Sequence, residues 1–211
     1  MGIGMNIATQ SHADAVRALR DTVFDHGHKN VELEFRMGRV VNGAFVAGVS
    51  KTIFETLLDI LCRSTAFVRA DVTTLEKLNG TDARFVITNG DEANGRWCYK
   101  KKVHASTEPT RRTSIALEGH DHAPPPPGSP PFTYHRLKKR SSFRHACWSV
   151  DLTRVTSNLP GHFDNDEEIY EVELELTGVD AYFVYTLDHL VAWGNHLVSE
   201  IEALLTRPKS L

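Results

Sequence analysis

Charged and apolar residues alternate along several short stretches of this chain, and this alternation limits the possible folds more than any other feature. In "EIYEVELEL" (168–176) three glutamates alternate with valine and leucine, and "NVELEFRMGRVV" (30–41) alternates acidic and apolar residues. Successive side chains of a strand point to opposite faces, so each stretch predicts a strand with one charged and one apolar face. One such strand alone is most simply explained by a solvated outer face.

The rest of the chain indicates an α+β fold with helices toward both ends. Amphipathic patterns predict helices over 11–24, 49–64 and 188–205, with Ser11 and Ser50 as N-caps of the first two. The first dozen residues are otherwise typical of a frayed terminus. Strands are expected over 83–90, 95–105, 111–119, 132–145 and 147–155. The proline-rich stretch 120–131 is typical of an exposed loop.

Composition favours an ordinary soluble domain. The formal net charge is −3, and the sequence contains no long apolar run and no secretory signal pattern. Cys62, Cys98 and Cys147 are widely spaced, which favours reduced thiols over disulfides or a zinc site. "HGHK" (26–29) and "HDH" (120–122) have no third ligand nearby in the sequence, so we interpret both as loops rather than metal sites.

The charged faces are segregated by sign, which argues against simple solvated surfaces. Glutamates gather on two strands, whereas "HRLKKR" (135–140) is basic. Such strands can form an open sheet, or a closed barrel whose charges line the lumen while its apolar side packs against outer helices. Five glutamates repel one another unless a cation lies among them, and hard divalent ions such as Mg²⁺ or Mn²⁺ prefer oxygen ligands. The nearby arginines and lysines suit a bridged polyanion such as a triphosphate.

Several motifs in order resemble one family. "VELEFRMG" and "YEVELEL" resemble the two glutamate motifs of the metal-dependent RNA 5′-triphosphatases of mRNA capping, which belong to the triphosphate tunnel metalloenzymes. Between them, "GVSKTIFETLL", "RRTSIALE", "RLKKRSSF" and "WSVDLTRV" resemble the family's intervening helix and strands in the family's order. The resemblance covers about residues 31–205. It implies a closed eight-stranded antiparallel β-barrel, the triphosphate tunnel, with packing helices outside.

The resemblance also implies a role for each charged residue in the motifs. The expected ligands of Mg²⁺ or Mn²⁺ are Glu32, Glu34 and Glu175. The expected catalytic residues are Glu118, which would orient the attacking water, together with Arg112, Lys138, Arg140, Glu171 and Glu173. The expected substrate-binding and supporting residues are Arg36, Arg84, Lys100, Lys102, Arg136, Asp151 and Thr153.

Two of these placements depart from or extend the family pattern. Arg36 stands where a lysine is common, and Ser149 stands where a basic residue is often found, so we expect Arg36 to keep the charge and Ser149 to weaken one contact. In "CYKKKV" we prefer Lys100 and Lys102, because they share a face, over Lys101.

The implied activity is removal of the γ-phosphate from triphosphate-ended RNA, the first step of cap formation, with added nucleoside triphosphate hydrolysis in Mn²⁺. An inorganic tripolyphosphatase or another triphosphate hydrolase of the same fold is the alternative. A non-catalytic phosphate-binding module is a third reading.

We expect an N-terminal segment with a short helix over 1–30 and the tunnel domain over 31–211. A guanylyltransferase is a candidate partner, no membrane is expected, and the location would be nuclear, or cytoplasmic for a cytoplasmic virus. The sequence leaves the oligomeric state open.

Overall fold

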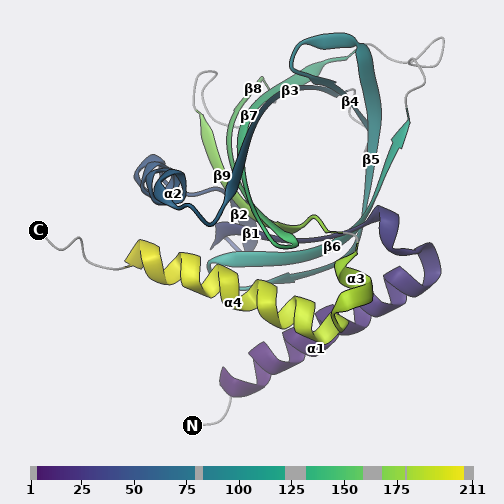
Figure 1. Cartoon of the computed structure of the whole chain (residues 1–211), viewed down its shortest axis with the longest axis vertical. Coiled ribbons are helices and arrows are strands. Elements are labelled where there is room, and N and C mark those ends of the chain that lie inside the picture. Colours follow the sequence, from purple (N-terminus) through teal and green to yellow (C-terminus); the bar gives the residue numbers. More distant parts are fainter. Residues whose placement is uncertain (1–3, 79–82, 122–131, 159–167, 179, 207–211) are drawn as a thin grey trace, which may run out of the picture.

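The structure is a computed structural model, and it describes residues 4–78, 83–121, 132–158, 168–178 and 180–206 (Figure 1). The helices of these residues are α1 (Gly4–His26), the 3₁₀ turn η1 (His28–Asn30), α2 (Lys51–Arg63), α3 (Ala181–Val184) and α4 (Leu187–Thr206). The strands are β1 (Val31–Val41), β2 (Ala44–Ala47), β3 (Val68–Leu78), β4 (Ala83–Thr88), β5 (Asp91–Thr107), β6 (Arg111–Asp121), β7 (Tyr134–His145), β8 (Trp148–Ser157) and β9 (Ile169–Leu176).

The strands close into a barrel. Hydrogen bonding follows the order β2-β1-β6-β5-β4-β3-β7-β8-β9, and β1 also pairs with β9. Among the described residues every pairing is antiparallel and β2 pairs only with β1, so β2 extends one wall while the other eight strands form the closed ring seen in Figure 1. The closed eight-stranded antiparallel barrel expected from the sequence is therefore confirmed.

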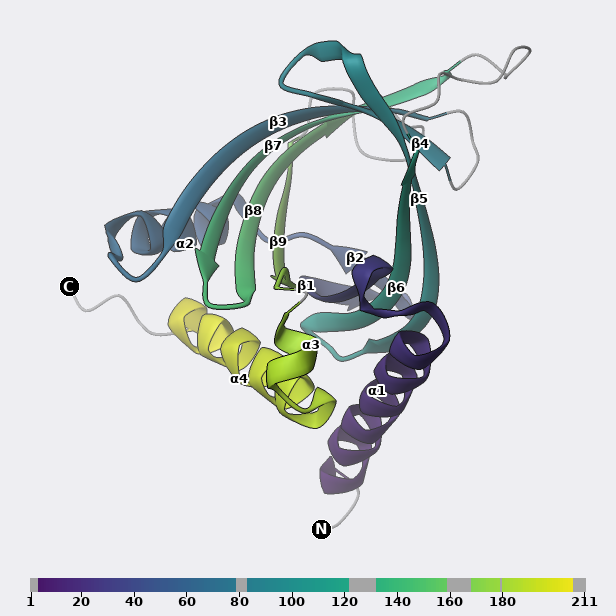
Figure 2. The ribbon, with the colours of Figure 1, turned by 45° about the vertical axis from the view of Figure 1, so that its right-hand side comes forward.

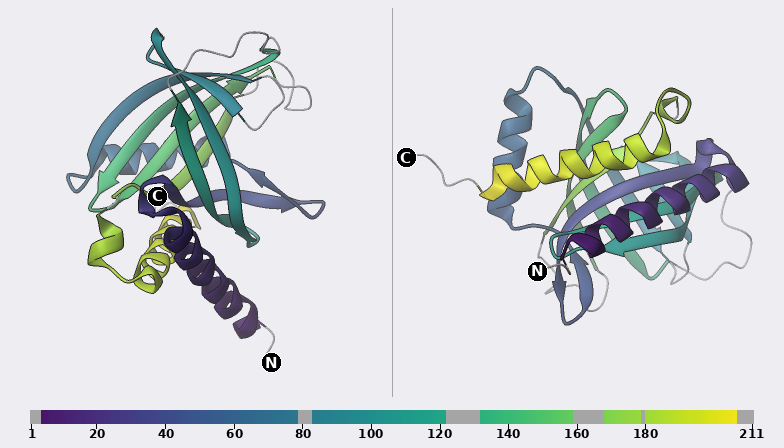
Figure 3. Two further views of the ribbon diagram at one scale, coloured as in Figure 1. Left: turned by 90° about the vertical axis from the view of Figure 1, so that its right-hand side faces the viewer. Right: turned by 90° about the horizontal axis from the view of Figure 1, so that it is seen from below.

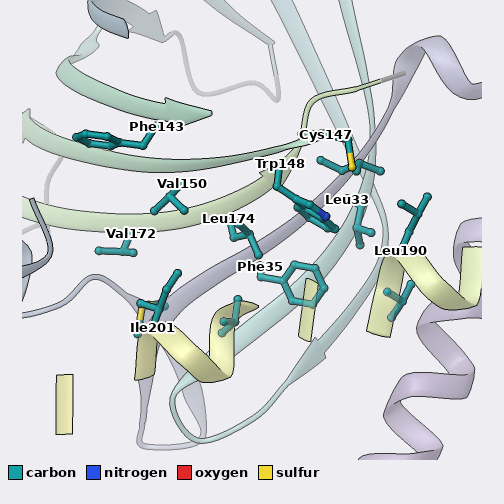
Figure 4. Close-up of a cluster of buried hydrophobic side chains, with 14 of the residues drawn as sticks. Leu33, Phe35, Phe143, Cys147, Trp148, Val150, Val172, Leu174, Leu190 and Ile201 are labelled. Carbon is teal, nitrogen blue, oxygen red and sulfur yellow. The ribbon is translucent and has the colours of Figure 1, made fainter. Parts of the chain in front are cut away.

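The hydrophobic core lies outside the barrel, between its wall and the helices. Leu33 and Phe35 of β1 are fully buried, as is Leu174 of β9. They pack with Trp148 of β8 and with Leu190 and Ile201 of α4 (Figure 4). Helices α1 and α4 lie side by side beneath the barrel (Figures 2 and 3), and α2 covers the wall near β9. The alternating stretches thus turn their apolar faces outward, as expected.

Local sequence signals account for the element boundaries. The Ser50 hydroxyl accepts a hydrogen bond from the Ile53 amide at 3.3 Å and caps α2, as predicted. Asn89 and Gly90 have φ angles of 50° and 77°, which suits the two-residue turn between β4 and β5. No helix of the described residues is long and apolar enough to span a membrane.

Two expectations about secondary structure are wrong, and one long strand was not expected. Helix α1 begins at Gly4 rather than at residue 11, so the terminus is helical further than the apolar pattern indicates. The proline-rich loop does not begin at 120, because His120 belongs to β6. Strand β3 was not predicted at all, since its outward face is largely exposed and "VRADVTTLEKL" lacks a clean apolar alternation. Residues 122–131 of the expected loop lie outside the described residues.

Gly194 provides a test of how closely α4 packs against the barrel. A methyl group added there would lie 2.8 Å from Trp148 Cη2 and closer still to Phe35. Alanine is favoured over glycine in a helix, yet we expect Gly194→Ala to lower the free energy of unfolding by about 1–3 kcal/mol because the site is overpacked. Urea denaturation measures the change. His196→Ala, on the exposed side of α4, is the control and should lose no stability. Equal stability of Gly194→Ala and wild type would contradict the close packing.

Candidate active site

The inward faces of the barrel strands carry nearly all the charged motif residues. Register places Glu34 of β1 opposite Ser114 of β6 and Glu175 of β9. In the same way Glu173 of β9 lies opposite Arg36 of β1 and Asp151 of β8. Directly opposed residues share a face of the sheet, so these side chains all point into the lumen. The structure therefore brings the acidic and basic motifs together in one enclosed space.

One acidic cluster consists of Glu32, Glu34 and Glu175. Glu34 and Glu32 are only 3% and 9% exposed. The Lys100 ammonium lies 2.8 Å from Glu32 Oε1 and 2.9 Å from Glu34 Oε2. A single lysine thus forms ion pairs with two buried carboxylates, while Glu175 faces Glu34 across the β1–β9 pair.

The pKa values show that this cluster is short of positive charge. Burial raises the pKa of Glu32 to about 8 and that of Glu175 to about 7, and neighbouring carboxylates add to both shifts. Burial also acts on Glu34, but the charges of Arg36 and Lys100 outweigh it and hold the pKa of Glu34 near 2. Glu32 therefore favours its protonated form near neutral pH, and Glu175 is close to half-protonated there.

The donor set suits a hard divalent cation. The buried Glu32 and Glu34 and the half-buried Glu175 come from two adjacent strands, and they contribute oxygen ligands only. Mg²⁺ and Mn²⁺ prefer such ligands. The raised pKa values of Glu32 and Glu175 are those expected of ligands without their cation, so the residues present fit a metal of this class.

A second network of ion pairs and hydrogen bonds holds Arg36 of β1 and Arg140 of β7 in place. Arg140 donates hydrogen bonds to Asp151 at 2.8 Å, to Glu173 at 2.9 Å and to the Thr153 hydroxyl at 3.1 Å. Arg36 contacts Glu173 from the other side and Glu34 at 2.9 Å. Glu173 and Asp151 thus hold these guanidinium groups in fixed positions.

Ser149 joins the same network. The Ser149 hydroxyl donates a hydrogen bond to Asp151 Oδ1 at 2.5 Å. The serine therefore bonds the carboxylate that holds Arg140.

A third network centres on Glu76 of β3, which the sequence analysis missed. Glu76 is 4% exposed and lies 2.9 Å from Lys138, with Arg84 and Arg136 each at 3.7 Å. Burial acts to raise the pKa of Glu76, but these three cations outweigh it and lower the pKa. The signal in the sequence is the alternation of Thr74 and Glu76 with Leu75, which is too short to predict β3.

Other cations face the lumen with fewer acidic partners. Burial lowers the pKa of Lys102, and the charges of Arg112 and Arg36 lower it further. Burial and Arg36 likewise lower the pKa of Arg112, whose guanidinium lies 4.9 Å from the ring centre of Phe45 on β2. These residues line a cavity of about 740 Å³ together with Glu34, Lys100 and Lys138. Mutual repulsion among the cations makes this part of the cavity suited to an anion.

The remaining predicted residues, Glu118, Arg136 and Glu171, also contact members of these networks. Glu118 of β6 faces Lys100 in register and contacts Arg84 at 3.2 Å. Arg136 reaches Glu171 at 3.8 Å. Lys100 and Lys102 share the inward face, as preferred from the sequence, and Lys101 alternates to the other face. The structure therefore brings together all sixteen of the residues singled out, although it does not test their roles.

Glu76 should be essential to stability because it neutralises buried cations. We expect Glu76→Ala to lower the free energy of unfolding by about 3 kcal/mol, since it leaves Lys138 buried without its closest carboxylate. The matched control is Glu92→Ala, which removes a carboxylate 3.5 Å from the more exposed Lys77 and should cost less than about 1 kcal/mol. Urea denaturation compares the two, and equal losses would contradict the special position of Glu76.

Sequence comparison links the chain to known capping proteins. The family described as "mRNA capping enzyme, beta chain" matches residues 110–185. The 5′RNA triphosphatase of Paramecium bursaria Chlorella virus 1 is 29% identical over 187 residues, which cover 87% of this chain and 94% of that protein.

Solved structures show the same fold. The Pct1 RNA triphosphatase of S. pombe matches with a TM-score of 0.69 and 18% identity, over 90% of this chain and 91% of that one. The Mimivirus capping enzyme triphosphatase matches with a TM-score of 0.63 and 14% identity, over 93% of this chain and 98% of that one. The chain is therefore similar in sequence to a viral RNA triphosphatase and to part of the capping-enzyme family, and it shares its fold with solved RNA triphosphatases.

Proposed function

We propose that this protein removes the γ-phosphate from the 5′-triphosphate end of nascent mRNA, the first step of cap formation. One observation carries the proposal. The same lumen holds a cluster of carboxylates that suits a divalent metal ion and, beside it, cations such as Lys102 and Arg112 that have few acidic partners. The similarity to a viral RNA triphosphatase over most of the chain supports RNA as the substrate. The diphosphate end would pass to a guanylyltransferase, in the nucleus or, for a cytoplasmic virus, in the cytoplasm.

Glu32, Glu34 and Glu175 would hold Mg²⁺ or Mn²⁺. When bound, the ion would neutralise negative charge on the phosphates and lower the pKa of a water ligand. We propose that Mn²⁺ also supports hydrolysis of free nucleoside triphosphates, because the residues that recognise phosphate do not depend on the RNA.

The protein's own cations would bind and orient the triphosphate. Phosphoryl transfer depends on positioning and on stabilising charge in the transition state rather than on covalent chemistry. Arg36, Lys102 and Arg112 are the inward cations best placed to donate hydrogen bonds to phosphate oxygens, since the charge of Arg36 repels both Lys102 and Arg112 when no anion is bound. Lys138, Arg140 and Arg136 are already braced by carboxylates, so they would meet the substrate without reorganisation.

Glu118 would act on the attacking water. Its carboxylate points into the lumen, where Arg84 holds it at 3.2 Å. An ionised carboxylate there can accept a hydrogen bond from water and orient it toward the γ-phosphorus. Glu171, Glu173, Asp151 and Thr153 would serve as positioning residues for the cations.

Removal of one predicted metal ligand tests the function. We expect Glu34→Gln to release phosphate from triphosphate-ended RNA at least about 100-fold more slowly than wild type in Mg²⁺ or Mn²⁺, because it loses one charged ligand. The control is Glu55→Gln on the exposed side of α2, which should keep full activity. Equal rates for Glu34→Gln and wild type would refute the proposal. Faster turnover of tripolyphosphate than of RNA would favour the alternative substrate.

The raised pKa of Glu32 predicts how stability depends on pH without metal. The folded-state pKa of about 8 lies above the ordinary value of 4.5, so the folded protein binds this proton more tightly than the unfolded chain does. The resulting stability is complete below pH 4.5 and is lost as the pH rises through 8. We therefore expect the free energy of unfolding in EDTA to fall between about pH 5 and pH 8.

Two comparisons check the cause of this slope. Glu32→Gln should reduce the slope, most of all above pH 7, because the amide does not titrate, whereas Glu175 still does. Saturating Mg²⁺ or Mn²⁺ should raise stability most at the alkaline end, because the ion binds the ionised carboxylates. Stability that increases with pH over this range in EDTA would contradict the prediction.

A further inference from the structure

A second group of side chains that could hold a metal lies on β5 and β6, apart from Glu32, Glu34 and Glu175. Cys98 and His120 face each other in register, and Cys98 Sγ lies 3.2 Å from His120 Nδ1. Glu118 is the next residue of β6 on the same face. Ligand atoms of the three residues all lie within 4.8 Å of one another. A thiol, an imidazole and a carboxylate therefore already converge on a single point.

The chemistry of this group differs from that of the tunnel glutamates. Thiolate and imidazole ligands select Zn²⁺ and similar borderline or soft ions, whereas carboxylates alone select Mg²⁺ or Mn²⁺. Three protein ligands leave the fourth position of a tetrahedral zinc ion to water. Cys98 is only 3% exposed, but the exposed His120 gives an ion a route from solvent.

Glu118 can exchange its present partner for a metal ion. Its carboxylate now contacts Arg84 at 3.2 Å. Arg84 also lies 3.7 Å from Glu76, so the guanidinium keeps a carboxylate partner when Glu118 turns away. The exchange therefore leaves no buried charge unpaired, which would otherwise cost several kcal/mol.

We propose that Cys98, Glu118 and His120 form a second site, specific for Zn²⁺, whose occupation inhibits the enzyme by drawing Glu118 away from Arg84 and from the attacking water. On binding, the Cys98 thiol releases its proton to solvent and the thiolate, the carboxylate and one imidazole nitrogen coordinate the ion. The inhibition rests on the proposed function, because it depends on Glu118 acting on the attacking water. The binding of zinc does not.

Cobalt spectroscopy tests the site independently of activity. Co²⁺ substitutes for Zn²⁺, and a cysteine ligand gives it a thiolate charge-transfer band. Added to the metal-free full chain, Co²⁺ should produce this band in wild type and in Cys62→Ser, which removes an exposed thiol. The band should be absent from Cys98→Ser and bleached in wild type by one equivalent of Zn²⁺. No band in wild type, or an equal band in Cys98→Ser, would overturn the proposed site.

Phosphate release in saturating Mg²⁺ tests the inhibition. Zn²⁺ should inhibit wild type and Cys62→Ser alike, whereas Cys98→Ser and His120→Asn should need at least about tenfold more Zn²⁺ for half-inhibition. Both variants keep the tunnel glutamates, so equal zinc sensitivity in all four proteins would place the effect in the tunnel and overturn the inhibitory role. Absence of phosphate release from wild type without zinc would instead refute the proposed function and leave the cobalt result standing.

Discussion

The fold depends on the pairing of opposite charges between neighbouring strands inside the barrel. Buried carboxylates and guanidinium groups are each costly to remove from water, and the cost is offset only where partners lie within hydrogen-bonding distance. Glu173 shows how closely this is arranged, since it contacts Arg36 of β1 and Arg140 of β7 and lies opposite Asp151 of β8. A shift of β9 by one residue would turn its glutamates into the hydrophobic core and its leucines into the lumen. Register and charge pairing therefore stabilise each other.

A polar lumen requires the hydrophobic core to lie elsewhere. The outward faces of β1, β8 and β9 form one side of that core, and α1, α2 and α4 form the other. The tight contact of Gly194 with Phe35 and Trp148 brings α4 close to the wall directly behind the residues of the active site. The helices therefore support the candidate site from behind, because they fix the strands whose opposite faces carry the proposed metal ligands.

The sequence predicted the parts of this structure that follow from a regular alternation. "VELEFR" and "YEVELEL" alternate with period two and have one buried face, so both the strands and the lumen could be anticipated. Strand β3 could not, because little packs on its outer side and its residues are selected mainly by their inward neighbours. Glu76 was missed for that reason. The proximity of Cys98 to His120 was also hidden, since it depends on the register between β5 and β6, which no local pattern determines.

The charge distribution couples the proposed metal to the substrate. Lys100 now neutralises Glu32 and Glu34, and a divalent cation bound to the same carboxylates would repel its ammonium. An incoming triphosphate adds negative charge beside Lys102 and Arg112, where positive charge already exceeds negative. Lys100 lines the same cavity, so it can turn from the glutamates to the phosphates without leaving the lumen. The ion and the substrate should therefore each favour binding of the other. The ion would take the place of the Lys100 ammonium at the glutamates, and the ammonium would then pair with the phosphates.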